Sequence, residues 1–196
     1  MVETVALSAG LAWASGIRLY LVLFLAGLLA RLGYLDLPEP LTVLSHPLVL
    51  GASGVMLVIE FVADKVPAID STWDALHTFI RIPVGAFLAA AALGTADPAW
   101  VAAAAILGGS IAAGTHLMKA GGRALINTSP EPISNWLAST TEDLLVPVGL
   151  FTAIVAPVAF LVGLAAFAVL AVWLLPKLWR GIRGMLVRLG RPAQSG

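Results

Sequence analysis

The segment GGSIAAGTHLMKAGGRALINTSPEPISNWLASTTE, residues 108–142, holds more polar side chains between apolar runs than any other part of the chain. Its first part reads as a helix in which His116, Lys119 and Arg123 share one face, and Asn127 extends the same stripe. Such groups are expensive in a membrane, so we expect the stripe to have a function inside the protein. The alternative is that Lys119 and Arg123 extend to the cytoplasmic headgroups, because both lie near a helix end.

The composition indicates a membrane protein. Of the 196 residues, 60% are hydrophobic and 11% are charged, whereas about a quarter of a soluble domain is charged. Apolar runs recur that are long enough, at roughly 20 residues, to cross a bilayer as helices. We therefore predict an all-α, polytopic membrane protein. The sequence contains no cysteine, which excludes disulfide bonds and thiolate metal sites.

The sequence contains one motif twice. Residues 31–42 read RLGYLDLPEPLT and residues 123–134 read RALINTSPEPIS, so both copies have an Arg, six residues and then Pro-Glu-Pro. Each copy lies between apolar segments, and the offset of 92 residues divides the chain into similar halves. An internal duplication explains both features. We predict a first membrane repeat at residues 1–95, a second at 96–180, and a disordered basic tail at 181–196.

The apolar runs divide into about six transmembrane helices, three in each repeat. The run at 144–175 is too long for one span, and Pro157 divides it because proline lacks the N–H group that continues a helix. With three spans per repeat, the second repeat enters the membrane from the opposite side, which is the inverted-repeat plan of many small transporters. The predicted spans are residues 4–31, 46–62, 71–94, 98–125, 133–156 and 158–179.

Basic residues set the expected orientation. The chain after Pro176 carries five of them and no acid: Lys177, Arg180, Arg183, Arg188 and Arg191. Positively charged segments stay on the cytoplasmic side of a membrane. We therefore expect the C-terminus in the cytoplasm, and an even number of spans places the N-terminus on the same side.

A second polar cluster lies at residues 60–81. Asp70, Asp74, His77 and Arg81 fall on one helical stripe of the predicted span that begins there. In one interpretation this is a helix start at the membrane surface, with acids near the positive end of the helix dipole and the Arg reaching the headgroups. In the other, the stripe faces a water-filled vestibule and pairs with the basic stripe described above.

Arg18 lies near the middle of the first predicted span. A charge at that depth costs at least ~3 kcal/mol on membrane-insertion scales, so we expect the side chain to face protein or water. Its candidate partners are Glu60, Glu142 and Asp143, which lie in other apolar segments.

Motifs of known enzymes are weak in the sequence. It contains no Gly-x-Ser-x-Gly and no His-Glu-x-x-His, and its glycines form no phosphate-binding loop. The histidines His46, His77 and His116 lie on different predicted spans, so they form a metal site only if the fold brings them together. We lean against an enzyme, expect no cofactor, and leave the presence of a metal open.

Three long motifs resemble one known family. They are SGIRLY at 15–20, FVADKVPAIDSTWD at 61–74 and HxxKAxxRxxxNxSPEPxSN at 116–135. Together they resemble the bacterial membrane family catalogued as domain of unknown function 4126, over most of the chain up to about residue 175. The resemblance implies an inner-membrane location and lends no activity.

The polar residues predict a small transporter or channel for an ion or small solute. An anion is slightly preferred, because basic residues dominate the central stripe. Acids and bases would neutralise one another as a gate or exchange partners as the solute enters, and His116 is the group we expect to titrate near neutral pH. The candidate solute-binding residues are Arg18, Asp64, Lys65, Asp70, Asp74, His77, His116, Lys119, Arg123, Asn127, Glu131, Asn135 and Glu142.

Two alternatives remain. In one, the protein binds a lipid headgroup or polyprenyl phosphate, as a flippase or phosphate enzyme, with Lys119 and Arg123 on the phosphate and a metal on Asp64, Asp70 or Asp74. In the other, it is a scaffold whose charges only fix helix ends. We expect membrane lipids and the solute as partners, a homo-oligomer because six short spans enclose little space, and no nucleic acid.

Overall fold

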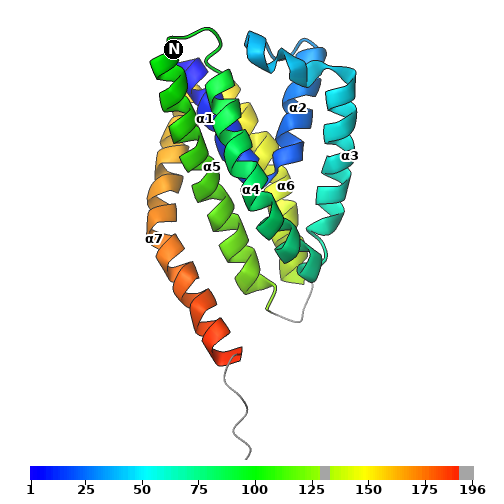
Figure 1. Cartoon of the computed structure of the whole chain (residues 1–196), viewed down its shortest axis with the longest axis vertical. Helices are drawn as coiled ribbons and strands as arrows, with labels where there is room; N and C mark the ends of the chain where they lie inside the picture. Colours follow the sequence, from blue (N-terminus) through cyan, green and yellow to red (C-terminus); the bar gives the residue numbers. More distant parts are fainter. Residues whose placement is uncertain (129–132, 190–196) are drawn as a thin grey trace, which may run out of the picture.

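The computed structural model describes residues 1–128 and 133–189, which form a bundle of helices without any strand (Figure 1). This confirms the all-α class. The elements are α1 (Val2–Ile17), α2 (Leu19–Arg31), the 3-10 helix η1 (Glu39–Ser45), α3 (Pro47–Ala63), α4 (Pro67–Ala91), α5 (Pro98–Ile126), α6 (Ile133–Val155) and α7 (Pro157–Leu189).

Prolines begin four of these helices: Pro47, Pro67, Pro98 and Pro157. Proline suits the first helical position, because the N–H group it lacks would have no partner there. The predicted break at Pro157 is therefore confirmed. The span predicted to start at residue 71 begins earlier, because Pro67 is the first residue of α4.

The first predicted span, 4–31, is wrong as a single helix. The chain breaks at Arg18, whose backbone is extended (φ −139°, ψ 82°), and α1 and α2 form a hairpin around this residue. Glu3 near the start of α1 and Asp36 just after α2 line one cavity of about 260 Å³, so both outer ends lie at the same end of the bundle. In Figure 1, α1 descends from the N-terminus and α2 returns upward.

The hairpin changes the expected number of crossings. Among the described residues, α5, α6 and α7 are long and apolar enough to span a membrane, and η1 with α3 makes a fourth span if the two are joined across their 66° bend. The N-terminus and the end of α7 lie at opposite ends of the bundle (Figure 1). This arrangement differs from six full crossings with both termini on one side.

The end of α7 also corrects the predicted tail. The helix continues to Leu189, so the disorder expected from residue 181 is wrong for residues 181–189. The last residues, 190–196, lie outside the described part of the chain. Arg180 and Arg183 are exposed and lie on this last part of α7, so the basic residues expected in a tail belong to a helix instead.

The core is built around α1, which packs against α4, α5, α6 and α7. Its residues Leu11, Trp13 and Ile17 are buried. The outer faces are apolar and exposed, for example at Phe79 on α4 and Val172 on α7, as expected for surfaces that meet lipid. Beside this apolar core the bundle also buries charged residues, and it exposes many large apolar side chains, which a soluble protein rarely does.

Helices α4 and α5 approach each other closely at Gly108. A methyl group added there would overlap the Cβ of Ala89. We expect Gly108→Ala to lower the free energy of unfolding by about 1–3 kcal/mol, because the two helices must separate. Thermal unfolding in detergent measures this. Gly114→Ala on the same helix is the control: nothing lies within 4 Å of its added Cβ, so its melting temperature stays the same or rises. Equal losses in both variants contradict the packing described.

The hairpin predicts a specific topology that the cysteine-free chain makes easy to test. Single substitutions Glu3→Cys, Tyr34→Cys and Arg183→Cys in whole cells are treated with a membrane-impermeant maleimide. We expect Glu3→Cys and Tyr34→Cys to be labelled from one side and Arg183→Cys from the other. Six full crossings give a different pattern, in which Glu3→Cys and Arg183→Cys share a side and Tyr34→Cys does not.

Candidate functional site

A network of ion pairs surrounds the turn of the α1–α2 hairpin, inside the bundle. Its cations are Arg18, Lys65, Arg81, Lys119 and Arg123, and its acids are Glu60, Asp64, Asp70, Asp74, Glu142 and Asp143. Most of these side chains are at least nine-tenths buried, and three of them, Lys65, Glu142 and Asp143, are 14–21% exposed. The network therefore reaches solvent only along one edge.

Arg18 is completely buried at the break between α1 and α2. Its guanidinium lies 2.5 Å from a carboxylate oxygen of Asp64 and 2.8 Å from one of Asp143, with Glu142 at 3.8 Å. It also donates to the hydroxyl of Ser139 at 2.9 Å. The expected partners Glu142 and Asp143 are confirmed. Glu60 is not a partner, because it lies against another arginine.

That arginine is Arg81, which is also completely buried. It lies 2.6 Å from Glu60 and 2.8 Å from Asp74, and one of its N–H groups faces His116 Nδ1 at 3.1 Å. A guanidinium only donates hydrogen bonds, so His116 Nδ1 accepts and carries no proton. The remaining ring nitrogen then donates to Thr78 at 2.7 Å. The two contacts together define one tautomer of the ring.

Lys119 lies at the centre of the network. Its ammonium is surrounded by four oxygens: Asp64 at 3.1 Å, Asp74 at 3.3 Å, Glu142 at 3.4 Å and the backbone carbonyl of Ile17 at 3.2 Å. Three of the four are carboxylates from different segments: Asp64 after α3, Asp74 on α4 and Glu142 on α6. The fourth belongs to the last residue of α1, where the break ends the helical hydrogen bonding.

Arg123, near the end of α5, contacts the ends of three other segments. It lies 3.1 Å from Asp70 and donates to the backbone carbonyls of Asn135 and Asp64, each at 2.7 Å. Asn127 donates to the other oxygen of Asp70 at 2.7 Å, and the Asn135 amide donates to the Asp64 carbonyl at 3.1 Å. The start of α4, the end of α5 and the start of α6 are thus held by one set of polar contacts.

These contacts decide between the interpretations of the two stripes. The α4 acids Asp70 and Asp74 pair with Arg123 and Lys119 of α5. The stripe of α4 is therefore a buried partner of the stripe of α5 and not a surface helix start, and both α5 cations are buried instead of extending to headgroups. The part of that interpretation in which the two stripes pair is confirmed, and Asp70 and Asp74 lie in the space between the helices.

Eleven of the predicted binding residues meet in this network or its hydrogen bonds: Arg18, Asp64, Lys65, Asp70, Asp74, His116, Lys119, Arg123, Asn127, Asn135 and Glu142. His77 lies beside it, stacked on Trp73 at 4.1 Å and hydrogen bonded to Tyr20 at 3.1 Å. Glu131 lies outside the described residues.

The prediction missed four members, Glu60, Arg81, Ser139 and Asp143, as site residues. A signal existed for two of them. Arg81 lies on the same stripe as Asp70 and Asp74, and Glu60 lies one turn before Asp64. Nothing in the sequence distinguishes Ser139 from the other hydroxyl residues of its segment.

The residues that could hold a metal are the three aspartates Asp64, Asp70 and Asp74, which place one oxygen each within 4.8 Å of one another. All three already pair with Arg or Lys side chains, so a divalent ion would have to displace these cations. The histidines do not converge. His46 caps the start of α3, His77 contacts Tyr20, and His116 contacts Arg81.

Comparison with known families covers most of the chain. Residues 5–177 match the family described as "Domain of unknown function (DUF4126)". The chain belongs to this family. No curated protein and no solved structure matches it. The DUF4126 match includes the turn of the hairpin and every charged residue of the network, so the network lies wholly within the family domain.

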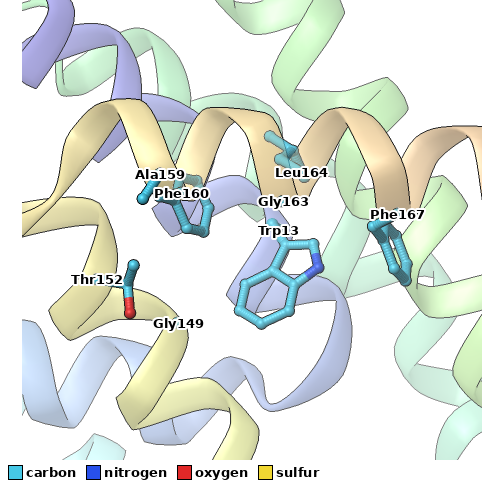
Figure 2. A pocket seen from close by; sticks show the side chains of 8 residues that line it. All are labelled: Trp13, Gly149, Thr152, Ala159, Phe160, Gly163, Leu164 and Phe167. Atoms are coloured by element: carbon cyan, nitrogen blue, oxygen red, sulfur yellow. The ribbon is translucent and has the colours of Figure 1, made fainter.

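Five cavities in the described part of this DUF4126 protein are lined by residues outside the ion-pair network. One of about 200 Å³ lies between α1, α6 and α7 (Figure 2). Trp13 forms one wall and meets Phe160 and Phe167 edge to face, at 6.0 and 6.4 Å between ring centroids. Thr152 is its only hydroxyl-bearing side chain among the lining residues, and that hydroxyl donates to the carbonyl of Val148. The cavity is therefore apolar and unsuited to an ion.

Arg18 provides a direct test of the network. We expect Arg18→Ala to lower the free energy of unfolding by about 3–5 kcal/mol, because it leaves buried carboxylates without their counter-charge. Arg31→Ala is the matched control, since Arg31 is exposed and, among the described residues, its side chain donates only to the Ser45 carbonyl; its effect should stay within about 0.5 kcal/mol. Thermal unfolding of both purified variants measures the difference. Similar stabilities for the two variants refute the buried pairing.

Proposed function

We propose that this protein is a small membrane transporter or channel for an ion or small solute, and that its path runs through the ion-pair network. One observation carries the proposal: the helix break at Arg18 places two half-helix ends inside the bundle, against buried charges. Interrupted helices are tolerated inside membrane proteins where their backbone lines a path or a binding site. A hairpin that served only for packing would not need an arginine at its turn.

The chemistry of the network fits this role. Isolated charges are costly in a membrane interior, so such residues usually mark pathways for ions or protons. Glu142 has the loosest contacts, at 3.4 Å from Lys119, 3.6 Å from Arg123 and 3.8 Å from Arg18. It also lies on the exposed edge. Exchange of partners therefore begins most easily at Glu142, with the solute entering from that edge.

The repeat arrangement supports the same proposal. The copy of the Arg-Pro-Glu-Pro motif at residues 31–42 follows α2, which ends at the same end of the bundle as the N-terminus (Figure 1). The second copy follows α5, which ends at the opposite end. We propose that α2–α4 and α5–α7 are inverted repeats, with the hairpin arm α1 filling the space between them. Assembly as a homo-oligomer in the inner membrane, surrounded by lipid, belongs to the same proposal.

The charge pattern favours this function over lipid phosphate binding. A phosphate site needs cations that are free to contact it, whereas Lys119 and Arg123 each contact two or more acids. A scaffold role would explain pairing at helix ends. A scaffold role does not explain why Arg81 and Glu60 are paired in the fully buried interior. For stability alone, two apolar side chains of similar size are usually at least as good.

Flux through proteoliposomes tests the proposal. We expect the purified protein to conduct or exchange monovalent ions, measured with ion-selective dyes in a panel of salts, and Glu142→Gln to reduce the rate at least about tenfold, the effect of about 1.4 kcal/mol on the barrier. Gln keeps the shape of Glu142 and removes the charge that exchanges partners.

Glu39→Gln is the control for this measurement. Glu39 is exposed in η1, at the other end of the bundle, and makes none of the ion pairs among the described residues. Its flux should equal that of the wild type. No flux above empty liposomes for any ion or small solute, or equal flux in both variants, contradicts the proposed path.

A further inference from the structure

The four oxygens around Lys119 form a set of ligands suited to a cation. Three carboxylates and one backbone carbonyl converge on one point from four segments: Asp64 after α3, Asp74 on α4, Glu142 on α6 and Ile17 at the end of α1. A carbonyl at the C-terminal end of a half-helix is a common ligand for coupling cations in transporters. In this structure the ammonium of Lys119 fills the site. We call these four oxygens the Lys119 cage.

The size of the cage suits a large monovalent ion. Its oxygens lie 3.1–3.4 Å from the nitrogen, which is longer than the roughly 2.7–2.9 Å of a strong bond between an ammonium and a carboxylate. Calcium and magnesium need about 2.0–2.6 Å, so the cage would have to contract further around them than around the larger potassium ion. Potassium and ammonium ions are close to the size of the lysine head, so they fit with little movement.

The charge balance indicates room for one more positive charge. Among the described residues, five cationic side chains face six carboxylates in the network. Helix dipoles do not remove the difference, because α1, α3 and α5 end near the network while α2, α4 and α6 begin there. Asp64 Oδ1 and Asp74 Oδ2 are buried and have no hydrogen-bond partner among the described residues. Both atoms belong to carboxylates of the cage.

We propose that the Lys119 cage is a monovalent-cation site for which Lys119 and a free cation the size of potassium or ammonium compete. This rests on the proposed function and gives its substrate class: the transported or coupled species is a monovalent cation. It enters past Glu142, displaces the lysine head, and leaves when the head returns. The excess of acid over base favours such a cation over the anion that the basic stripe of α5 alone suggests.

A variant that lacks the Lys119 ammonium allows cation binding to the Lys119 cage to be measured. Lys119→Ala is purified in detergent with choline chloride, and its melting temperature is followed as potassium or ammonium chloride replaces choline at constant ionic strength. We expect a saturable rise of about 3–6 °C at ten times the dissociation constant, with a smaller rise for sodium. Lys177→Ala, which removes an exposed lysine of α7 that contacts Trp173 and lies outside the network, should show no difference between these salts.

A second variant and a double variant complete the test. Lys119→Met keeps the length of the side chain, so it serves if Lys119→Ala yields no folded protein; recovery of either variant only in potassium or ammonium supports the cage. In Lys119→Met with Asp74→Asn, the response should be lost. The proposal is overturned if both single variants have the same melting temperature in choline, potassium and ammonium chloride.

The flux measurement keeps the two proposals separate. Wild-type flux together with no cation response in the Lys119 variants rejects the cage and leaves the transport function standing. A saturable response in those variants, with no wild-type flux for any solute, supports the cage as a binding site and rejects transport.

Discussion

Charges buried in an apolar bundle must neutralise one another, and this constraint organises the structure. Arg18, Arg81, Lys119 and Arg123 each contact acids from at least one other helix, so the network joins α1, α3, α4, α5 and α6. Apolar packing alone would fix these helices weakly, because lipid tails solvate apolar side chains as well as other helices do. The ion pairs supply the directional contacts that select one arrangement.

The break at Arg18 follows from the same constraint. A continuous helix from residue 2 to residue 31 would carry one arginine in the middle of a long apolar surface. By ending α1 at Ile17 and starting α2 at Leu19, the chain turns at the charged residue and places it among carboxylates. The same turn releases the carbonyl of Ile17 to Lys119. The hairpin thus places a backbone carbonyl and carboxylate side chains around the same ammonium group of Lys119.

Much of this could be predicted from the sequence. Proline positions and apolar runs located α3 to α7, and helical spacing correctly grouped His116, Lys119 and Arg123 on one face that meets the α4 stripe. The hairpin could not be predicted, because neither proline nor a turn motif marks Arg18, and only its tertiary partners explain the break. Pairing was predicted in part: Glu142 and Asp143 were found for Arg18, whereas Glu60 was assigned to the wrong arginine, since spacing along a helix does not fix which neighbour faces it.

The distance in sequence between Arg18 and its partners has a consequence for biogenesis. Ser139 lies 121 residues after Arg18, so the ribosome synthesises the hairpin long before α6 exists. During that interval the arginine has no complete set of counter-charges. Arg18 therefore has Asp64 as a counter-charge from early in synthesis and gains its contacts with Ser139 and Asp143 only once α6 has been made.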